Sequence, residues 1–326
     1  MAGYFLTSEE PSDALSVLRP EWNEFLKGAP TLSERINFLK TQIPDFHPEK
    51  LFPFTHRLGA VSDVNGFSNA HLRQPDVFLR LRPGSASTVS AQLKQAGIPF
   101  AVYGNTVTVP SGTPVDQALE LNRHVVVQDA SSQRVGEFIE KAAGLLPPKP
   151  KVWDCCAASG GKSILATDIL GNLQLTVSDI RESILHNLRQ RLQEANIRNY
   201  HSFSADLSSE NSFLPLEVDT FDLVMADVPC TGSGTWSRTP EQLMYFREDE
   251  INGFAELQYK ILQRVLPFVK KNGLLLYITC SVFRSENEDM VMKLEEEQGL
   301  TALEFRYLEG YARKADTLFA CLLKKP

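Results

Sequence analysis

Short apolar runs alternate with amphipathic helical runs through the second half of the chain, and this alternation limits the possible folds most strongly. Five apolar runs come first, in the order "KVWDCC", "LQLTVSD", "YHSFSAD", "FDLVMADVP" and "GLLLYITCS". Two more, "TALEFRYL" and "TLFACLLKK", follow near the C-terminus. Strands that alternate with helices are typical of a parallel sheet with helices on both faces. We therefore predict an α/β domain built on a mostly parallel, seven-stranded sheet.

The proline-rich segment "GLLPPKPKV", residues 144–152, marks a domain boundary, because its prolines cannot continue a helix. We assign residues 149–326 to the α/β domain. Residues 71–148 follow the order strand, helix, hairpin, helix, strand, with the second helix at "VDQALELN". This order predicts a small split-βαβ module, a type that many RNA-binding proteins use, although a purely structural platform would show the same order. Residues 1–70 are predicted to form a helical segment.

Composition and cysteine spacing argue against several classes of protein. The apolar runs are all much shorter than the roughly 20 residues that span a bilayer, so we expect no membrane segment. The start, "MAGYFLTSEEPSD", lacks the basic and apolar regions of a signal peptide, and we therefore expect a cytoplasmic protein. The five cysteines include no C-x-x-C pair and the six histidines are scattered, which argues against a disulfide framework and against a metal site.

Charge is distributed unevenly along the chain. The formal net charge of -7 argues against indiscriminate binding to nucleic acid. Residues 71–151, in contrast, contain 9 Lys and Arg residues and 6 Asp and Glu residues. This small excess has two explanations, a solvated surface or a contact with nucleic acid.

The segment "DCCAASGGKS", residues 154–163, lies where the first strand of the predicted sheet meets its helix. Small residues at such a turn let the backbone approach a ligand, and the amides of a helix N-terminus favour an anion. The segment is not a phosphate-binding loop, because the G-x-x-x-x-G-K-[ST] spacing requires glycine where Cys156 stands. A simple turn of small residues is the alternative interpretation.

Acidic residues end the successive strands that follow this turn. Asp179, Asp206 and Asp227 end the second, third and fourth strands, and Asp154 ends the first. A strand-end aspartate usually caps a helix, but the carboxyl ends of parallel strands also open on a common crevice. An acid at the end of the second strand can accept the hydroxyl groups of a ribose. We therefore predict a site for an adenosine that carries a carboxylate in place of a pyrophosphate.

Two cysteines follow the next pair of strands. Cys230 lies in "DVPCTGSG" after the fourth strand, and Cys280 lies in "YITCS" after the fifth. A free cysteine is most often a small buried hydrophobic residue. If the two strands are neighbours, however, both thiols open on the same crevice. This pairing favours a nucleophilic role for Cys280.

In these segments the chain closely resembles the Sun-type (Nop/Sun) RNA cytosine carbon-5 methyltransferases, in particular those that act on bacterial ribosomal RNA. The matching runs, in family order, are "VVQDASSQ", "DCCAASGGKS", "SD" at 178–179, "AD" at 205–206, "ADVPCTGSGTWSRTPE" and "YITCSVFRSENED". The resemblance implies a Rossmann-like class I methyltransferase domain with S-adenosylmethionine as the cofactor. It implies that Cys280 is the nucleophile, that Cys230 assists product release, and that Asp227 binds the reacting base. The cofactor contacts that it implies are Cys156, Ala157, Ala158, Ser159, Gly160, Gly161, Lys162, Asp179, Asp206 and Asp227. Ser159 is a departure, because the family usually has proline at this position.

The same resemblance implies an RNA partner, and ribosomal RNA is favoured over transfer RNA. We expect Arg80, Arg82 and Arg123 to contact RNA phosphates and the protein to act as a monomer. Two alternative functions make different demands on the cysteines. A DNA cytosine methyltransferase would use Cys230 as its nucleophile and would not need Cys280. A non-catalytic ribosome-assembly factor would need neither thiol.

Overall fold

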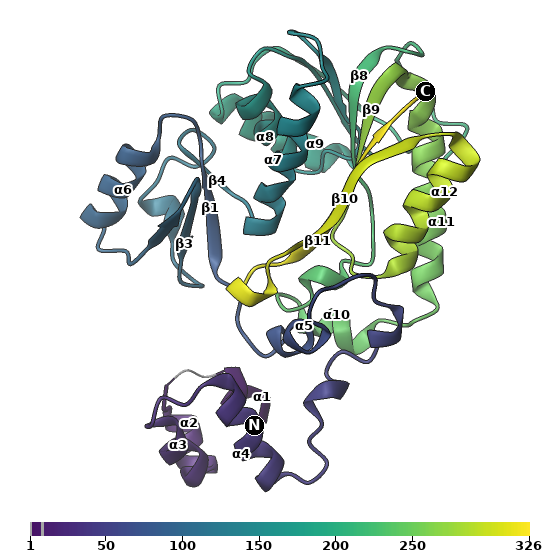
Figure 1. The fold of residues 1–326 in the computed structure, drawn as a ribbon. Coiled ribbons are helices and arrows are strands. Elements are labelled where there is room, and N and C mark those ends of the chain that lie inside the picture. Colours follow the sequence, from purple (N-terminus) through teal and green to yellow (C-terminus); the bar gives the residue numbers. More distant parts are fainter. Residues whose placement is uncertain (1, 8–9) are drawn as a thin grey trace.

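The computed structural model of the chain describes residues 2–7 and 10–326. One large sheet has the strand order β10-β11-β9-β8-β5-β6-β7 (Figure 1). Its strands are β5 (Lys151–Asp154), β6 (Gln174–Asp179), β7 (Tyr200–Ser204), β8 (Phe221–Asp227), β9 (Val269–Thr279), β10 (Thr301–Glu309) and β11 (Thr317–Lys324). All neighbours from β9 to β7 pair in parallel, whereas β11 pairs antiparallel with both β9 and β10. The predicted α/β fold with a mostly parallel, seven-stranded sheet is confirmed.

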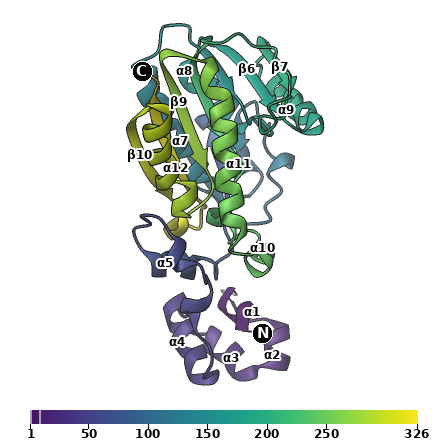
Figure 2. The same cartoon turned by 90° about the vertical axis from the view of Figure 1, so that its right-hand side faces the viewer.

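Side chains of the large sheet alternate between its two faces, as the two-residue period of a strand requires. On β9, Leu274, Leu276 and Ile278 pack into one core cluster, while Leu275 and Tyr277 pack into another. Helices α7, α8 and α9 cover the first face, and α11 and α12 cover the second (Figure 2). The bounds of these helices are α7 (Ala130–Ala143), α8 (Gly161–Leu170), α9 (Glu182–Glu194), α11 (Glu250–Val265) and α12 (Glu288–Gln298). Burial on both faces explains why the strands read as continuous apolar runs.

A second, four-stranded sheet has the order β2-β3-β1-β4, and every neighbouring pair in it is antiparallel. It consists of β1 (Val77–Leu81), β2 (Ala101–Tyr103), β3 (Thr106–Val109) and β4 (Val125–Val127). Helix α6 (Ala86–Gln95) covers one face, with Val89 and Leu93 packed against Leu79 and Val107. This is the strand order of a split-βαβ module.

The second helix expected in this module, at "VDQALELN", is wrong. The segment contains one 3-10 turn, Val115–Gln117. Val115 and Leu119 are still buried, so the apolar spacing that predicted a helix is used by a shorter turn. Asn122, with a φ of 62°, adopts the left-handed conformation before the chain enters β4.

Helix α7 falls within residues 71–148, the range assigned to the small module, but it packs with the large sheet. Val135, Phe138 and Ile139 share a core cluster with Val152 of β5 and Leu223 of β8. The proline-rich segment therefore connects two elements of the same core. The unit that contains the large sheet begins N-terminal to the predicted boundary at residue 149.

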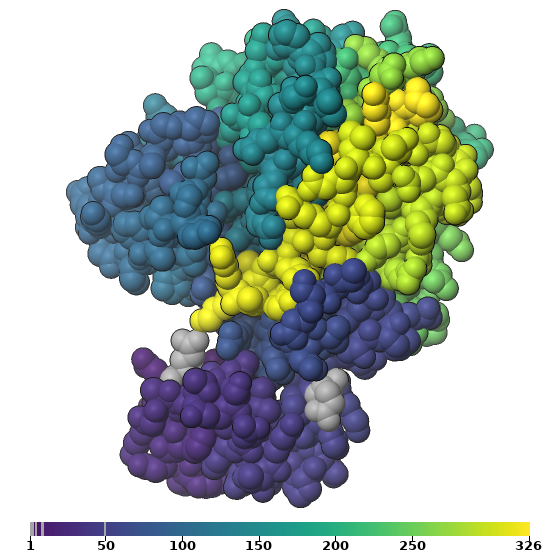
Figure 3. Space-filling model, viewed as in Figure 1, coloured from purple at the N-terminus to yellow at the C-terminus, as the bar shows by residue number. Residues whose placement is uncertain are grey.

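The N-terminal segment is helical, as predicted, but it divides into two parts. Helices α1 (Ala2–Thr7), α2 (Asp13–Leu18), α3 (Pro20–Leu26) and α4 (Leu32–Gln42) form a separate lobe around their own core (Figures 1 and 3). Helix α5 (Val64–Ala70) packs against the large domain instead. Phe67 of α5 and the preceding Phe52 share a core cluster with Trp236 and Phe283. Short helix α10 (Pro240–Tyr245) contributes Leu243 to the same core cluster.

Within residues 2–7 and 10–326, no helix is both long enough and apolar enough to cross a membrane.

Candidate active site

Cys230 and Cys280 lie side by side beyond the carboxyl ends of two neighbouring strands. Strands β8 and β9 run parallel, with Asp227 opposite Ile278 at their ends. The loops that follow bring the two sulfur atoms to 3.1 Å from each other. The backbone N–H of Cys280 also donates to the sulfur of Cys230 at 3.3 Å. The structure therefore brings together the two thiols that were predicted to share one crevice.

The surroundings of Cys230 favour its neutral form. The hydrogen bond with Cys280 and burial together raise the pKa of the Cys230 thiol well above its ordinary value. A thiol that remains protonated at neutral pH is a weak nucleophile, since the thiolate is the reactive form. Cys230 is therefore suited to hold a proton beside Cys280.

Lys162 and Asp227 form an ion pair next to the thiols. Lys162 lies in the first turn of α8, and its Nζ is 2.5 Å from Oδ2 of Asp227 at the end of β8. Burial alone would lower the pKa of Lys162, but the negative charge of Asp227, with a smaller effect from Cys280, holds that pKa above its ordinary value. The ammonium group thus remains charged and fixes the position of the Asp227 carboxylate.

Glu286 joins the loops that carry the two cysteines. Its carboxylate is fully buried and accepts hydrogen bonds from the backbone N–H and the hydroxyl of Thr231, next to Cys230, at 2.9 and 2.7 Å. It also accepts from the Ser281 hydroxyl, next to Cys280, at 2.5 Å, and from Nε2 of Gln258 at 2.8 Å. Burial raises the pKa of Glu286. The motif "SENED" contains this residue, but sequence reasoning gave it no role.

The loop after Cys230 requires glycine at position 234. A Cβ atom at this position would lie 1.9 Å from the carbonyl oxygen of Thr317 and 3.0 Å from that of Cys280. The N–H of Gly234 donates to the Cys280 carbonyl at 2.9 Å. The loops after β8 and β9 and the start of β11 therefore pack backbone against backbone.

The loop between β5 and α8 contains the predicted cofactor contacts Cys156, Ala157, Ala158, Ser159, Gly160, Gly161 and Lys162. Gly160 has a φ of 84°, and a Cβ there would lie 3.1 Å from Cγ of Leu188. No side chain caps the N-terminus of α8, and a Cβ at Gly161 would meet nothing within 4 Å. The first amides of α8 therefore have no side-chain acceptor, and the space beside Gly161 is open.

Ser159, which replaces the proline usual in the family, is held by a contact from another helix. Nη1 of Arg191 donates to the Ser159 carbonyl at 2.9 Å and to its hydroxyl at 2.6 Å. These bonds restrain a loop that a proline ring would otherwise stiffen.

Asp179 ends β6 directly beside this loop. Its carboxylate is 6% exposed and accepts from the N–H of Ala158 at 3.0 Å and from the N–H of Arg181 at 3.0 Å. It also accepts from Nε of Arg181 at 3.2 Å. A carboxylate has about four acceptor sites, so one site remains for a further donor. Asp154, in contrast, is completely buried behind the loop and accepts from the Ser163 hydroxyl at 2.6 Å.

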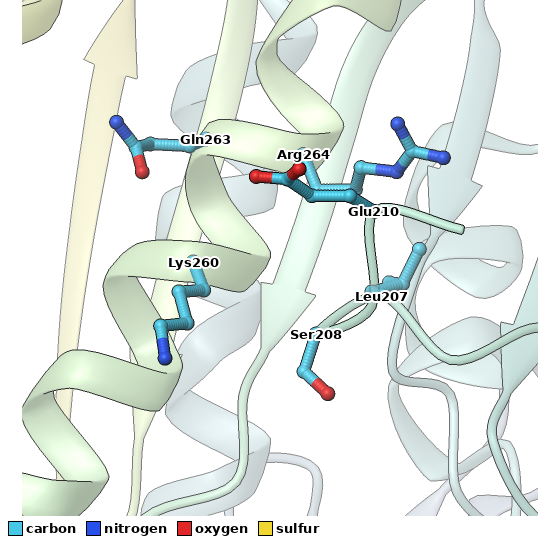
Figure 4. Close-up of a pocket in the computed structure, with 6 residues that line it drawn as sticks. All are labelled: Leu207, Ser208, Glu210, Lys260, Gln263 and Arg264. Atoms are coloured by element: carbon cyan, nitrogen blue, oxygen red, sulfur yellow. The ribbon is translucent and has the colours of Figure 1, made fainter. Parts of the chain in front are cut away.

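Asp206 lies two residues beyond the end of β7 and stabilises the turn that follows it. One of its oxygens accepts from the N–H and the hydroxyl of Ser208, at 2.9 and 2.6 Å. Next to this turn, a hollow of about 620 Å³ opens between residues 207–210 and the outer side of α11 (Figure 4). Its lining includes Lys260 and Arg264 but none of the predicted site residues. The cofactor contact expected of Asp206 therefore remains a prediction.

The residues of this region fit the cofactor that the resemblance implies. Uncapped amides at the start of α8 suit a carboxylate, and the buried Asp179 offers a remaining acceptor site to a ribose hydroxyl. The small side chains leave room for the ligand against the backbone.

Two of the three arginines predicted to bind RNA are used inside the protein, and this expectation is corrected. Nη1 of Arg80 is 2.6 Å and Nη2 of Arg82 is 2.7 Å from the carboxylate of Asp168, on α8. The side chains of Arg80 and Asp168 are only 5% and 6% exposed. These contacts join the small sheet to the large domain. Arg123 is exposed and paired with Glu120, so its phosphate contact remains a prediction.

Among the residues that the structure describes, no group of three or more His, Cys, Asp or Glu side chains is arranged to hold a metal ion.

Comparison with known proteins assigns the chain to a family. The model of the family described as 16S rRNA methyltransferase RsmB/F matches residues 143–316, which is more than half of the chain. This chain belongs to the RsmB/F family. The match covers the cofactor loop, the strand-end acids and both cysteines, and it begins at the end of α7.

Curated relatives of this RsmB/F chain carry the same family name. It is 31% identical over 209 residues to ribosomal RNA small subunit methyltransferase B of Xanthomonas campestris pv. campestris, covering 62% of this chain and 46% of the relative. It is 30% identical over 199 residues to ribosomal RNA small subunit methyltransferase F of Shewanella loihica, covering 55% and 40%. The chain thus spans about half the length of these relatives.

Solved structures support the fold of this RsmB/F chain. A methyltransferase homolog from Pyrococcus horikoshii matches with a TM-score of 0.68 and 21% identity, covering 88% of this chain and 98% of the other. NSun6 from the same organism, solved with SFG, matches with a TM-score of 0.68 and 13% identity, covering 85% and 97%. At these identities the similarity establishes the fold alone.

Proposed function

We propose that this protein transfers a methyl group from S-adenosylmethionine to carbon 5 of a cytosine in RNA, and that the RNA is ribosomal. The observation that carries the proposal is the pair of thiols, Cys230 and Cys280, 3.1 Å apart and beside the Lys162–Asp227 ion pair. Membership of the RsmB/F family and the names of its curated relatives support RNA as the substrate class.

The loop of residues 156–162, with Asp179, Asp206 and Asp227, would hold S-adenosylmethionine. When bound, this cofactor supplies an electrophilic methyl group. The uncapped start of α8 would take its carboxylate, and Asp179 would accept from its ribose. Both features lie at the carboxyl edge of the sheet, where the cysteines also lie.

Cys280 makes carbon 5 of the cytosine ring reactive by forming a covalent bond to the ring. Carbon 5 of cytosine is a poor nucleophile, and addition of the Cys280 thiolate to carbon 6 makes carbon 5 enamine-like and reactive. The thiolate donates the electron pair of the new sulfur–carbon 6 bond, and the π electrons of the carbon 5–carbon 6 double bond shift toward carbon 4 and nitrogen 3 of the ring. Ring nitrogen 3 takes up a proton from solvent, and Asp227, held by Lys162, is placed to accept hydrogen bonds from this nitrogen and from the amino group, which stabilises the adduct.

Cys230 acts after carbon 5 has gained its methyl group. A base removes the proton from carbon 5, the carbon 6–sulfur bond breaks, and Cys280 leaves as a thiolate. Cys230, which burial and its neighbour keep protonated, is 3.1 Å from the departing sulfur and can donate a hydrogen bond to it. The target base must leave any stack to be reached in this way.

We further propose that the protein acts as a monomer, without a metal ion, in the cytoplasm where ribosomal RNA is assembled. Transfer RNA is the alternative substrate. A non-catalytic assembly role is disfavoured by the thiol pair, because RNA binding alone gives no reason to hold two sulfur atoms in contact.

Methyl transfer can be measured directly on unmodified RNA. The purified protein is incubated with methyl-labelled S-adenosylmethionine and in vitro transcripts of 16S ribosomal RNA or of transfer RNA, and the nucleosides are analysed by mass spectrometry. We expect labelled 5-methylcytidine from the ribosomal transcript and none with Cys280→Ala. Label only in transfer RNA would change the substrate, and label in neither RNA would refute the enzymatic proposal.

A further inference from the structure

An exposed aromatic ring and an exposed guanidinium meet where the small sheet approaches the large one. Tyr103, on β2, is 74% exposed, and the guanidinium carbon of Arg313 lies 4.8 Å from the centre of its ring. Arg313 belongs to the turn between β10 and β11, which lies beside the lower end of the small sheet in Figure 1. Within the part of the chain that the structure describes, Arg313 makes no ion pair. Its charge is therefore available to a ligand.

Tyr103 lies on the open face of the small sheet. It pairs directly with Thr106 of β3, and directly paired residues share a face, so Tyr103 lies opposite the face that α6 covers. On the same open face, Arg80 forms an ion pair with Asp168 of α8, and the Thr106 hydroxyl donates to Gln133 of α7. The large domain therefore occupies the central part of this face and leaves the edge strand β2 uncovered.

The pair borders a hollow of about 630 Å³ whose lining comes from both domains, including Phe78, Thr108, Ser131 and Ala315. The carboxylates at this hollow are already engaged. Glu137 pairs with Arg134, and Glu309 accepts from the N–H of Ser62 at 2.6 Å. The hollow thus presents an aromatic face and, in Arg313, a guanidinium without an ion-pair partner among the described residues.

The hollow is connected to the cysteines through fixed backbone. The hydroxyl of Ser131 donates to the carbonyl of Asp316 at 2.8 Å, which anchors the turn that carries Arg313. Ala315, which lines the hollow, is two residues from Thr317, so they are separated by at most about 7 Å. Thr317 packs against Gly234, and Gly234 donates to Cys280. The hollow and Cys280 are therefore joined by one short run of packed backbone.

We infer that Tyr103 and Arg313 form a stacking site for an unpaired base of the substrate RNA next to the target cytosine. The inference rests on the proposed function for its substrate class. Flat aromatic and guanidinium faces stack on any base, and the free charge of Arg313 attracts the phosphate backbone. Bases within a duplex cannot stack in this way, so the site selects a single-stranded segment.

Binding is tested by fluorescence anisotropy with a short fluorescein-labelled single-stranded RNA and with the same RNA annealed to its complement. Tyr103→Ala should weaken single-strand binding by about tenfold, the effect of one lost base stack, and Tyr103→Phe should bind like the wild type. Arg313→Ala should also weaken it and reduce the slope of log affinity against log salt by about one. Phe213→Ala is the matched control, because Phe213 is 82% exposed after β7, at the opposite edge of the large sheet.

Three results would overturn the inference. Tyr103→Ala could bind single-stranded RNA like the wild type, or weaken single-strand and duplex binding equally. The third result is that both Tyr103→Ala and Tyr103→Phe lower the melting temperature and the RNA affinity to the same extent. The contact between Tyr103 and Arg313 would then be a structural contact between the two sheets.

Methyl-transfer kinetics separate this inference from the proposed function. We expect Tyr103→Ala to raise KM for RNA about tenfold with kcat unchanged, because the ring binds RNA but does not touch the reacting atoms. An unchanged KM in an active enzyme contradicts the stacking site alone. A wild-type protein that binds the single strand through Tyr103 but transfers no methyl contradicts the proposed function alone.

Discussion

Replacing Glu286 tests whether one buried carboxylate aligns both cysteine loops. Its Oε2 accepts from the Thr231 N–H and from Nε2 of Gln258, which are donors that cannot become acceptors. Its Oε1 accepts from the hydroxyls of Thr231 and Ser281, which can rotate and accept instead. Glu286→Gln can therefore keep the network with its amide oxygen at the Oε2 position. Glu286→Ala leaves two fixed donors without a partner.

The magnitudes follow from this difference. Each buried donor left unsatisfied costs about 1–3 kcal/mol, so Glu286→Ala should lower the free energy of unfolding by about 2–6 kcal/mol. Glu286→Gln exchanges charge-assisted hydrogen bonds for neutral ones, at a loss of about 1 kcal/mol for each bond. It also removes the free-energy cost of burying a charged carboxylate, the same burial that raises the pKa of Glu286. Its net destabilisation should be about 2 kcal/mol or less. Methyl transfer should largely survive in Glu286→Gln and be lost in Glu286→Ala.

Urea unfolding and initial rates of methyl transfer measure the two effects. Asp289→Ala is the matched control, because Asp289 is three residues away and makes only an exposed pair with Arg284; this variant should change stability by at most about 0.5 kcal/mol. Affinity for S-adenosylmethionine should be unchanged in Glu286→Gln, since Glu286 has no contact with the loop of residues 156–162. A Glu286→Ala variant as stable and active as Asp289→Ala would refute the role assigned to this carboxylate.

Three further changes have expected outcomes. Asp179→Ala should weaken S-adenosylmethionine binding by about 1–3 kcal/mol in calorimetry, and an unchanged affinity would remove Asp179 from the site. Asp168→Ala should destabilise the protein by about 3–5 kcal/mol in urea unfolding, because it removes the one carboxylate that Arg80 and Arg82 share, whereas the exposed Asp249→Ala should have little effect. Burial raises the pKa of Asp154 to about 7, so the folded protein retains a proton that the unfolded chain releases near about pH 4. The free energy of unfolding should therefore fall by up to about 4 kcal/mol from this group as pH rises from about 4 to 7, and a pH series in which Asp154→Asn shows the same slope as the wild type would contradict this.

The strands and their order along the chain could be predicted because they are buried on both faces. β6 was expected over residues 173–179 and spans Gln174–Asp179, and β8 was expected over residues 221–229 and spans Phe221–Asp227. A short, mostly apolar run that ends in a charged residue defines such a strand well. The order of the strands within the sheet could not be predicted in this way. The two thiols meet because β8 and β9 are neighbours in that order.

Residues whose partners are distant in the chain could not be assigned. Arg80 and Asp168 are 88 residues apart, and a positively charged strand face has the same sequence pattern whether its partner is a phosphate or a buried carboxylate. Glu286 stands among other acids in "SENED", and no periodicity shows that it alone is fully buried against two loops. The short turn at Val115–Gln117 shows the same limit, because burial at positions i and i+4 does not require a full helix.

Covalent trapping tests the assigned roles of the two cysteines most directly. RNA substrate and S-adenosylmethionine are incubated with each variant and resolved on a denaturing gel, where RNA bonded to protein migrates slowly. If Cys280 attacks carbon 6 and Cys230 acts only in release, Cys230→Ala should accumulate the adduct, while Cys280→Ala and the double variant should show none. An adduct with Cys280→Ala and none with Cys230→Ala would reverse the roles and indicate the DNA-type mechanism. No adduct in either variant, with methyl transfer retained in both, would show that neither thiol is the nucleophile.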